Sequence, residues 1–402
     1  MGRGCPQGSS MKITWSVPVP GARMDSGRGD LVRAAKLIAA LRDAGHDVVL
    51  VHGASDVNTA AAVSVYRGSV RRMVPTPVAL ALRDVGRVLH ARRHARRVAM
   101  AAQRQGAELI VETQVHFSDS GARAARICGL PLLLDDCSPV DEESLMGSGL
   151  TSLARAAFAR QARAARALTV SSEVLRDRLI RDGLPPAKIH VIPNGVDLAL
   201  HESAVRTSAR AWLRLGAGPV LGFVGSFQPW HRLDLLMDAM QRIADARGLR
   251  LLLAGDGPGL QPALAEARRR GVADRVAHVG ALPPDQIPLV LAACDIGVLP
   301  GSNDYGQPMK LLEYGAAGLP SVAPDLPPVR AVVEHEQTGL LFRPGDAGEL
   351  VAVLHRLLHD VELRHRLGIA ARRRITTDGG WNERARALRW LGEGLLDGGA
   401  TC

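Results

Sequence analysis

The chain has 402 residues, of which 47% are hydrophobic and only 3% aromatic, and its formal net charge is +10 at pH 7. This length exceeds one typical hydrophobic core and indicates two domains, and an apolar content made mainly of Ala, Leu and Val is typical of α/β layers. The positive charge is almost all arginine spread along expected helices, and with so few aromatic side chains it argues against a nucleic-acid-binding protein.

Cysteine spacing and hydropathy exclude further classes of protein. The five cysteines form no CxxC pair, so we expect neither a zinc site nor a disulfide framework, and we place the protein in a reducing cytoplasm. No uninterrupted apolar run reaches the length of about 18 residues that spans a membrane, although peripheral membrane contact stays open. The first ten residues lack the apolar segment of a signal peptide, and the native start is Met1 or Met11.

The first half of the chain alternates short apolar runs with amphipathic stretches. An apolar run at Lys12–Val17 leads into a glycine-containing loop, and a helix is expected at Leu31–Ala44. Further strands are expected at Asp47–Val51, Leu109–Glu112, Pro131–Asp135, Ala167–Ser171 and Ile189–Ile192. This alternation predicts a Rossmann-like parallel sheet in an N-terminal domain over residues 11–200, with the Asn-Gly at 194–195 as its exit turn.

The second half repeats the plan. Strands are expected at Pro219–Gly225, Leu249–Gly255, Arg275–Gly280, Asp295–Leu299 and Pro320–Ala323, with a helix at Leu233–Ala246. They predict a second Rossmann-like domain over residues 201–380, and a C-terminal helix over residues 381–402 that packs back toward the first domain. The carboxyl ends of both sheets are expected to face a cleft between the domains, the usual ligand position in such α/β proteins.

The segment after Asp295–Leu299 carries the most chemistry. A loop of Gly, Ser, Asn and Asp precedes a helix that begins near Pro308 and ends at the Gly-Leu-Pro of residues 318–320. A strand, a Gly-rich loop and a helix N-terminus make an anion-binding corner, because free amides and the positive end of the helix dipole point at it. Lys310, at an exposed helix start, adds a charge, and Glu313 can accept hydrogen bonds from sugar hydroxyls. These groups suit a nucleoside diphosphate sugar.

Five phrases resemble, in order and spacing, the retaining glycosyltransferases of family four. They are VIPNGVD, FVGSFQPWHRLDLLMDA, LLLAGDGP, VAHVGALPPDQIPLVLAACDIGVLP and QPMKLLEYGAAGLPSVA, within a resemblance that runs from Lys12 to about Leu396. The resemblance implies the GT-B fold and transfer of a sugar from a nucleoside diphosphate donor with retention at the anomeric carbon. It also implies a donor site in the C-terminal domain and no metal ion or other cofactor.

The resemblance further assigns the donor site. The family has an arginine where this chain has Ser226 and a lysine where it has His231, which leaves Arg232 and Lys310 as substitutes, or else a non-catalytic relative with a weakened grip on phosphate. We expect three catalytic residues, Lys310, Arg232 and His231. The expected donor-binding residues are Gly225, Ser226, Gly280, Tyr305, Gly306, Gln307, Met309 and Glu313.

The expected mechanism uses the donor's own leaving group. No carboxylate pair stands out opposite the donor site as nucleophile and acid/base. The departing diphosphate would therefore accept the acceptor's proton on the same face of the sugar. Amides near Gly306–Met309, with Lys310 and Arg232, would stabilise the developing charge.

The N-terminal domain is expected to bind the acceptor. The glycine-rich loop after the first strand is either an acceptor-binding loop or a plain turn, and the histidine after the third strand is either a ligand or a surface residue. Two aspartates at a strand end, with acidic residues at 141–143, form either a seat for a cationic acceptor or a solvated loop. The expected acceptor-binding residues are Gly27, Arg28, Gly29, Asp30, His116, Asp135 and Asp136.

The resemblance also suggests substrates. The SGRGD and DD-x-x-P phrases look similar to those of actinobacterial members that glycosylate aminocyclitols in antibiotic biosynthesis, so we expect UDP-N-acetylglucosamine or UDP-glucose as donor and an acceptor such as 2-deoxystreptamine. The alternatives are a cell-envelope lipid or polysaccharide acceptor, or a nucleotide-sugar epimerase of the same fold. In Arg83–Arg97 the arginines flank Val85, Val88 and Leu89, which allows an interfacial helix on a membrane, but we expect an ordinary outer helix.

Overall fold

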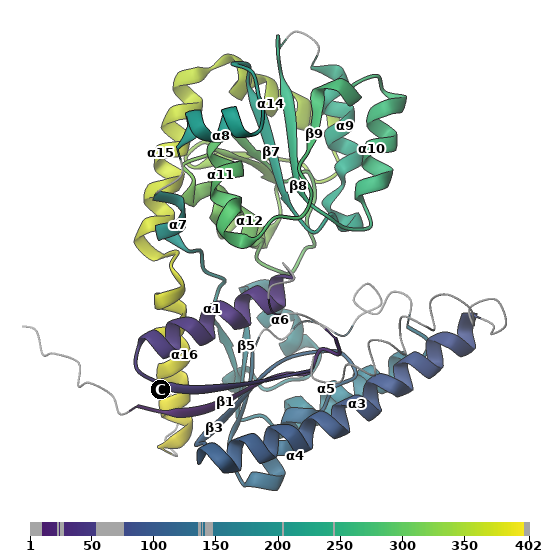
Figure 1. The fold of residues 1–402 in the computed structure, drawn as a ribbon, viewed down its shortest axis with the longest axis vertical. Helices are drawn as coiled ribbons and strands as arrows, with labels where there is room; N and C mark the ends of the chain where they lie inside the picture. The colour runs from purple at the N-terminus through teal and green to yellow at the C-terminus, as the bar shows by residue number, and fades with distance from the viewer. Residues whose placement is uncertain are drawn as a thin grey trace, which may run out of the picture. The chain divides into compact units, whose positions relative to one another are not determined.

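The computed structural model describes residues 10–21, 24, 28–53, 76–135, 138, 140, 148–202, 205–243 and 246–397. The chain divides into two compact units. The described parts of Met1–Ser26, Asp30–Pro193 and Arg384–Cys402 form the first, and Gly27–Gly29 with Asn194–Glu383 form the second. Each unit is built on a parallel sheet with helices against it (Figure 1).

The first unit contains a six-stranded parallel sheet with the strand order β2-β1-β3-β4-β5-β6. Its strands are β1 (Lys12–Val17), β2 (Asp47–His52), β3 (Leu109–Thr113), β4 (Leu132–Asp135), β5 (Ala167–Val170) and β6 (Ile189–Val191). The strands β3, β4 and β5 are buried at every position. Burial of consecutive residues is what strands covered by helices on both faces require.

Helices of the first unit hold this sheet from its faces and ends. They are α1 (Gly29–Asp43), α3 (Thr76–Gln105), α4 (Ser120–Cys128), α5 (Thr151–Ala164), α6 (Glu173–Arg181) and, from Arg384 on, α16 (Trp381–Leu396). Trp15 lies fully buried in β1, and its indole N–H donates to Thr113 Oγ1 at 3.0 Å. Gly392 of α16 lets the helix approach β3, because a Cβ there would lie 3.2 Å from a methyl group of Leu109.

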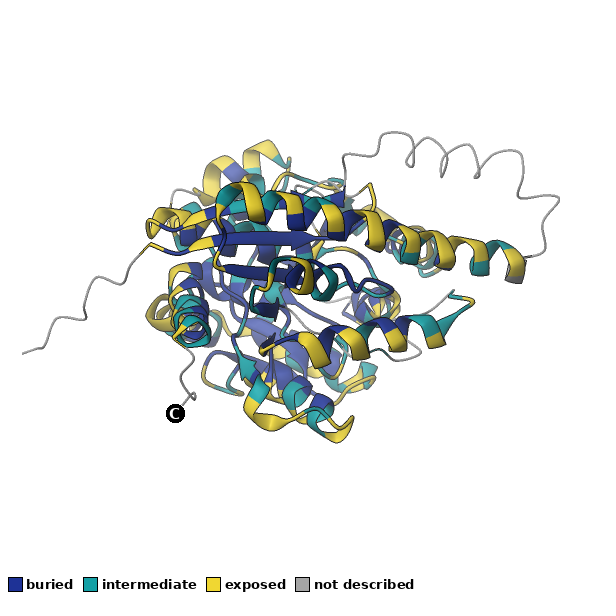
Figure 2. Cartoon of the chain, turned by 90° about the horizontal axis from the view of Figure 1, so that it is seen from below, coloured by how far each residue is buried: buried dark blue, intermediate teal, exposed yellow. Residues whose placement is uncertain are grey.

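The second unit contains another six-stranded parallel sheet, ordered β12-β11-β10-β7-β8-β9. Its strands are β7 (Val220–Gly225), β8 (Arg250–Gly255), β9 (Val276–His278), β10 (Ile296–Val298), β11 (Ser321–Pro324) and β12 (Gly339–Phe342). Its helices are α7 (Leu198–Glu202), α8 (Arg206–Trp212), α9 (Leu233–Arg242), α10 (Leu260–Arg269), α11 (Ile287–Ala292), α12 (Met309–Ala316), α13 (Pro327–Arg330), α14 (Ala347–His359) and α15 (Val361–Asp378). Figure 2 shows strands in dark blue and the outward sides of helices in yellow, the pattern of a buried sheet.

A tyrosine fixes α12 on the second sheet. The Tyr314 side chain is fully buried, and its hydroxyl donates to Val298 O at 3.3 Å and accepts from the Val224 backbone N–H at 3.4 Å. Gly297 makes room for the ring, because a Cβ there would lie 2.4 Å from Tyr314 ring atoms. The start of α12 is thereby held at the carboxyl ends of β7 and β10.

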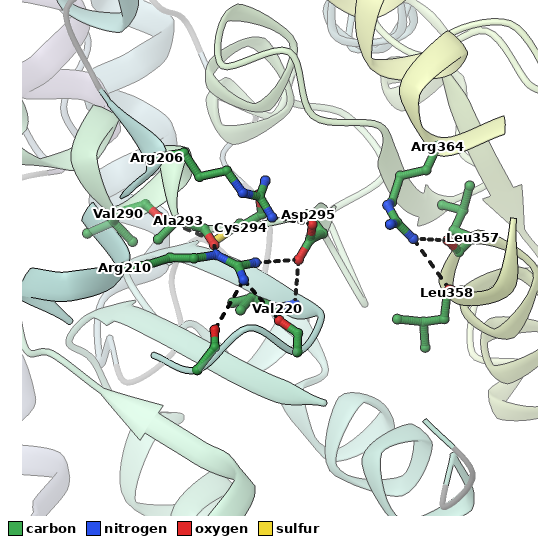
Figure 3. Close-up of polar contacts among 12 residues, drawn as sticks. Arg206, Arg210, Val220, Val290, Ala293, Cys294, Asp295, Leu357, Leu358 and Arg364 are labelled. Carbon is green, nitrogen blue, oxygen red and sulfur yellow. Dashed lines mark hydrogen bonds and ion pairs between the residues drawn. The ribbon is translucent and has the colours of Figure 1, made fainter. Parts of the chain in front are cut away.

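An arginine cluster anchors α8 at the amino ends of the strands of the same sheet (Figure 3). Asp295, just before β10, accepts hydrogen bonds from Arg206, from Arg210 at 2.7 Å and from the backbone N–H of Val220 at 2.8 Å. Beyond it, Arg364 donates to Leu357 O at 2.7 Å and so satisfies a carbonyl near the end of α14. The bonds of Asp295 join elements at the amino ends of β7 and β10, and the bond of Arg364 joins α15 to α14. We assign both to the stability of the fold.

The sequence predicts the strands closely, with one omission. The predicted strands at Lys12–Val17 and Pro219–Gly225 agree with β1 and β7 to within one residue, and the helix predicted from Leu233 ends earlier, at Arg242. The strand β12 was not predicted. Its four residues are buried because they pair with β11 and pack in the core, which the local sequence does not specify.

Candidate functional site

The position of the first turn of α12 is fixed by the turn that precedes it and by the packing of the helix's buried face. Asn303 Oδ1 accepts from the backbone N–H of Gly306 at 2.8 Å, and Pro308 precedes the first helical residue, Met309. The helix then buries Leu311, Leu312, Tyr314, Gly315 and Ala316 in the second unit. The amides of the first turn consequently lie at the carboxyl end of β10, as the anion-binding corner requires.

Lys310 lies against a histidine and the end of β7. Its Nζ is 3.1 Å from His231 Nε2 and 5.7 Å from the centre of the Phe223 ring. Gly225 accommodates the lysine stem, because its φ of 152° suits glycine and a Cβ there would lie 3.0 Å from Lys310 Cε. The expectation that Lys310 is exposed is therefore wrong: these neighbours make it half-buried.

His231 is held as a neutral imidazole. It ends the 3-10 turn Pro229–His231, is buried, and accepts the Gln228 backbone N–H on Nδ1 at 3.1 Å. A neutral ring that accepts on Nδ1 carries its proton on Nε2, so the His231 N–H faces Lys310 Nζ. The lysine can accept this bond only in its uncharged form, and a charged Lys310 and this N–H are two donors that an anion between them would satisfy. Burial, and then the charge of Lys310, lower the pKa of His231 to about 2. His231 can therefore donate a hydrogen bond here but does not supply a second positive charge.

Lys310 and Glu313, one turn apart on α12, titrate near neutral pH. Burial lowers the pKa of Lys310 to about 8, against the opposing effect of Glu313. Burial also raises the pKa of Glu313 to about 7, and the charge of Lys310 opposes that rise. An anionic ligand at the start of α12 would favour the charged form of Lys310.

Arg232 is already engaged by a carboxylate. The residue has φ 50° and ψ 48°, and its side chain is bonded to Asp234 through Nε at 2.9 Å and Nη2 at 2.8 Å. Asp234 therefore neutralises the charge that was expected to replace a missing phosphate-binding cation. Arg232 stays a predicted catalytic residue, with a local partner that the sequence spacing could have revealed.

Two glycine-rich loops complete the corner. Gly255 and Gly257 allow their loop to touch the loop after β7, because a Cβ on either would lie 1.9 Å from a carbonyl oxygen, of Gly225 and Ser226 respectively. Gly280 O accepts from Gly255 N–H at 2.7 Å. The structure thus brings together five predicted donor-site residues at the carboxyl ends of the strands, namely Gly225, Ser226, His231, Gly280 and Lys310. Gln307 lies in the loop before α12, and Met309 and Glu313 lie on α12 with Lys310. Tyr305 and Gly306 lie in the preceding loop and are half-buried.

Asn194, which the sequence predicts only as part of a turn, also contacts the loop before α12. Its backbone N–H donates to Gln307 Oε1 at 2.6 Å, and its side-chain amide donates to Gln307 O at 3.1 Å. These bonds tie the VIPNGVD phrase to the loop before α12 and orient Gln307. The signal was present in the sequence, because both segments belong to the phrases that carry the resemblance.

The predicted acceptor residues are only partly placed. Gly27, Asp136 and positions 141–143 lie outside the described residues. Arg28 and Gly29 are exposed at the start of α1, followed by half-buried Asp30. His116 is half-buried in the loop after β3. The roles of these residues stay predictions.

Asp135 corrects one expectation. Its carboxylate is fully buried and accepts from Arg33 Nη2 at 2.9 Å, from Arg33 Nε at 3.1 Å and from Thr169 Oγ1 at 2.6 Å. Arg33 Nη1 also donates to Pro193 O at 3.2 Å. Asp135 therefore joins β4, β5 and α1, and it is wrong as a free seat for a cationic acceptor.

A second buried carboxylate belongs to Glu112, which was not among the predicted site residues. It accepts from Ser16 Oγ at 2.6 Å, Ser120 Oγ at 2.6 Å and Gln161 Nε2 at 2.8 Å. Burial raises the pKa of Glu112 in spite of these bonds. The network joins β1, β3, α4 and α5 and thus stabilises the first unit. It could not be predicted, because its residues are far apart in the sequence.

Neither a metal cluster nor a membrane-spanning helix occurs in the part of the chain that the structure describes. Within the described ranges, no three His, Cys, Asp or Glu side chains are grouped so that they could hold a metal ion. No helix among those residues is both long and apolar enough to cross a bilayer.

Comparison with known proteins decides the family. A model of Glycosyltransferase Family 4 matches residues 32–200, and a model of Glycosyl transferases group 1 matches residues 218–360. The chain belongs to glycosyltransferase family four.

Curated relatives of this family-four chain act on ring polyols and lipids, according to their names. A D-inositol 3-phosphate glycosyltransferase of Nocardia farcinica is 33% identical over 220 residues, which are 52% of this chain and 48% of the relative. A 2-deoxystreptamine glucosyltransferase of Streptomyces kanamyceticus is 33% identical over 181 residues, or 43% and 46% of the two chains. A GDP-mannose-dependent phosphatidylinositol monomannoside mannosyltransferase of Mycobacterium tuberculosis is 27% identical over 252 residues, or 60% and 66%. The match to the first two spans about half of each relative's length.

Solved structures resemble the chain along nearly its whole length. Anabaena HepE, in complex with UDP and glucose, has a TM-score of 0.74 at 18% identity and covers 95% of this chain and 99% of its own. Sucrose-phosphate synthase from Thermosynechococcus elongatus has a TM-score of 0.75 at 19% identity, with 96% and 100% covered. The predicted fold class, two Rossmann-like parallel sheets of the GT-B type, is confirmed.

Neither of the two positions at which the resembled family has a cation, Ser226 and His231 in this chain, carries a positive charge here. Ser226 is exposed and uncharged at the end of β7. His231 is buried and neutral. Lys310 is consequently a cation of the described residues at the start of α12 that does not occupy either of these two positions.

Proposed function

We propose that this protein transfers a sugar from a UDP-sugar to a hydroxyl group of a cyclitol, with retention of the anomeric configuration. The observation that carries the proposal is the placement of Lys310 in the first turn of α12, against His231 and Gly225 at the ends of the sheet strands. A lysine charge, first-turn amides and an imidazole N–H are together the donors that a diphosphate needs.

The donor is argued from the carboxyl edge of the second sheet. The diphosphate would lie at the start of α12, where Lys310 neutralises it and His231 donates from Nε2. The Glu313 carboxylate, one turn further, would accept from ribose hydroxyls. UDP is favoured because a neighbour of similar fold binds UDP and glucose, and the favoured sugars are glucose and N-acetylglucosamine.

Charge stabilisation would supply most of the catalysis. As the bond to the anomeric carbon breaks, negative charge grows on the diphosphate, and Lys310 with the α12 amides lies where it develops. Loss of one such donor costs about 2.7–4 kcal/mol in other enzymes. The leaving oxygen would take the proton of the attacking hydroxyl on the same face, which gives retention.

The acceptor is proposed as a cyclitol because two relatives share that chemistry. Inositol phosphate and 2-deoxystreptamine are both six-membered carbocycles rich in hydroxyl groups, and both appear in the names of proteins 33% identical to this chain. The structure gives no separate support for an amine on the cyclitol, because Asp135, which was predicted to bind that amine, forms an ion pair with Arg33. A lipid-linked cyclitol is the second candidate, and the name of a third relative favours it.

A panel assay tests the proposal. The protein is incubated with UDP-glucose, UDP-N-acetylglucosamine or GDP-mannose, each with myo-inositol, inositol 3-phosphate or 2-deoxystreptamine. We expect nucleoside diphosphate release that depends on a cyclitol, a product heavier by one sugar, and an anomeric configuration equal to that of the donor by NMR. Sugar conversion without any acceptor would indicate an epimerase instead, and the Lys310→Ala variant provides the background rate.

A further inference from the structure

The outer face of α3 carries an exposed apolar row. Val78, Leu82, Val85 and Leu89 are 48%, 54%, 41% and 47% exposed. Their spacing of four, three and four residues aligns them along one side of the helix. The first half of α3 extends beyond the sheet of its unit (Figure 1). The row spans about three turns of this part of the helix, and its four side chains are exposed. A helix that serves only as an outer layer would carry polar side chains there.

The same face continues as a basic surface. Arg92 and Arg96 follow the row at the same helical spacing and are exposed, with exposed Arg93 beside them. The helix as a whole has seven arginines and one aspartate, in a chain whose net charge is +10. The single aspartate, Asp84, is buried and accepts the backbone N–H groups of Gly149 and Leu150 at 2.7 and 3.1 Å. Asp84 also pairs with Arg83 at 3.3 Å and with Arg87 at 3.4 Å, so it offsets charge in the first half of α3. The helix has no second acid to offset Arg92, Arg93 and Arg96.

A hollow lined by arginines lies between α3 and α4. Its volume is about 170 Å³, and it is lined by Arg92, Ala95, Arg96, Arg123, Arg126 and Ile127. Asp119 holds Arg123 at 2.7 Å. Within the described ranges, no carboxylate pairs with Arg92, Arg96 or Arg126. Ile127, at the rim, is 53% exposed, so the hollow combines positive charge with an apolar edge.

We propose that this face, formed by the apolar row of α3 and the arginine hollow against α4, docks on an anionic phospholipid bilayer. The row would enter the boundary between headgroups and acyl chains, and the arginines would bind lipid phosphates. A nucleic acid suits the face less well, because the exposed apolar row has no partner in a phosphate backbone. Neither α3 nor α4 contains Phe, Tyr or Trp on which bases could stack, and His90 and His94 of α3 are buried. The inference does not depend on the sugar-transfer site.

Vesicle sedimentation of the full-length protein tests the charge. The vesicles contain phosphatidylcholine alone or with about one third phosphatidylglycerol, and we expect binding only to the anionic ones, weakening as salt rises. One arginine near such a surface contributes about 1 kcal/mol, or about fivefold in partition coefficient. The variant Arg92→Ser/Arg96→Ser/Arg126→Ser should then bind about a hundredfold more weakly. The matched control, Arg366→Ser/Arg372→Ser/Arg373→Ser, removes three exposed arginines of α15 and should bind like the wild type.

A second pair of variants tests the apolar row. Leu82→Gln/Leu89→Gln should reduce binding at least tenfold, whereas Val361→Gln/Ile369→Gln, which changes side chains 62% and 57% exposed on α15, should not. All four residues are surface residues, so folding, followed by circular dichroism, should be unchanged. Equal binding to neutral and anionic vesicles, or equal loss in variant and control, would overturn the proposal. So would binding of duplex DNA or RNA, lost in the triple arginine variant, without binding to anionic vesicles.

Discussion

At the residue scale, the contact of Lys310 with His231 decides what the donor site can do. The Gln228 amide fixes the imidazole proton on Nε2, so the histidine is a donor and the lysine is the group that changes charge. In the proposed donor site a diphosphate would accept from both. The site would then hold the diphosphate with one titrating cation and one neutral donor, and its affinity should depend on pH.

The first prediction concerns that dependence. Because burial lowers the pKa of Lys310 to about 8, the lysine loses its charge as pH rises through this value, earlier than an exposed lysine would. The affinity for UDP should therefore fall between about pH 8 and pH 10, while the affinity for uridine, which has no phosphate, serves as the matched reference. Calorimetry at several pH values gives the ratio of the two dissociation constants. A ratio constant across this range would show that Lys310 does not hold the diphosphate.

The second prediction concerns Glu313. Burial raises its pKa to about 7, so the carboxylate is formed only as pH rises through neutrality, and affinity that depends on it should strengthen from pH 6 to pH 8. Glu313→Gln should weaken UDP and uridine binding alike, by the 1.5–3 kcal/mol of a hydrogen bond to a charged group, or about 10- to 150-fold. It should also remove the gain in affinity above pH 6. Unchanged uridine affinity in the variant would refute the ribose-binding role.

At the element scale, buried ion pairs and close packing hold the elements that carry the site. Tyr314 fixes α12 on β7 and β10, and the cluster around Asp295 anchors α8 at the amino ends of the same two strands. In the first unit, Arg33 of α1 reaches Asp135 of β4, whose carboxylate also accepts from Thr169 of β5. These contacts join elements that are far apart in sequence.

The third prediction separates this structural role of Asp135 from acceptor binding. Asp135→Asn leaves the Arg33 guanidinium buried without its counter-charge, which costs about 3–5 kcal/mol when a buried ion pair is broken. We expect the unfolding free energy from urea denaturation to fall by that amount. The double variant Arg33→Leu/Asp135→Leu, which removes both charges, should be more stable than Asp135→Asn. If instead Asp135→Asn keeps full stability and raises the KM of a cationic acceptor, the residue binds the acceptor after all.

At the scale of the whole molecule, hydrophobic patterning was enough to predict two parallel sheets, because buried parallel strands read as short apolar runs between helices. It was not enough for β12, whose burial depends on pairing with β11. The corner at α12 could be predicted because its strand, loop and helix are contiguous. The partner of Asp135 could not, because Arg33 lies 102 residues away, and the half-burial of Lys310 arises from Phe223, Gly225 and His231 on another strand and loop.

The most direct test of the central claim is the affinity of the protein for UDP and for uridine, measured by calorimetry in the wild type and in Lys310→Met. Methionine keeps an unbranched apolar stem as far as the ε position and removes the charged ammonium group. The account predicts that the wild type prefers UDP strongly and that uridine affinity is unchanged in the variant. The preference for UDP should fall by about 10- to 150-fold, which corresponds to a charged hydrogen bond of about 1.5–3 kcal/mol. Equal preference for UDP in the wild type and the variant would contradict it.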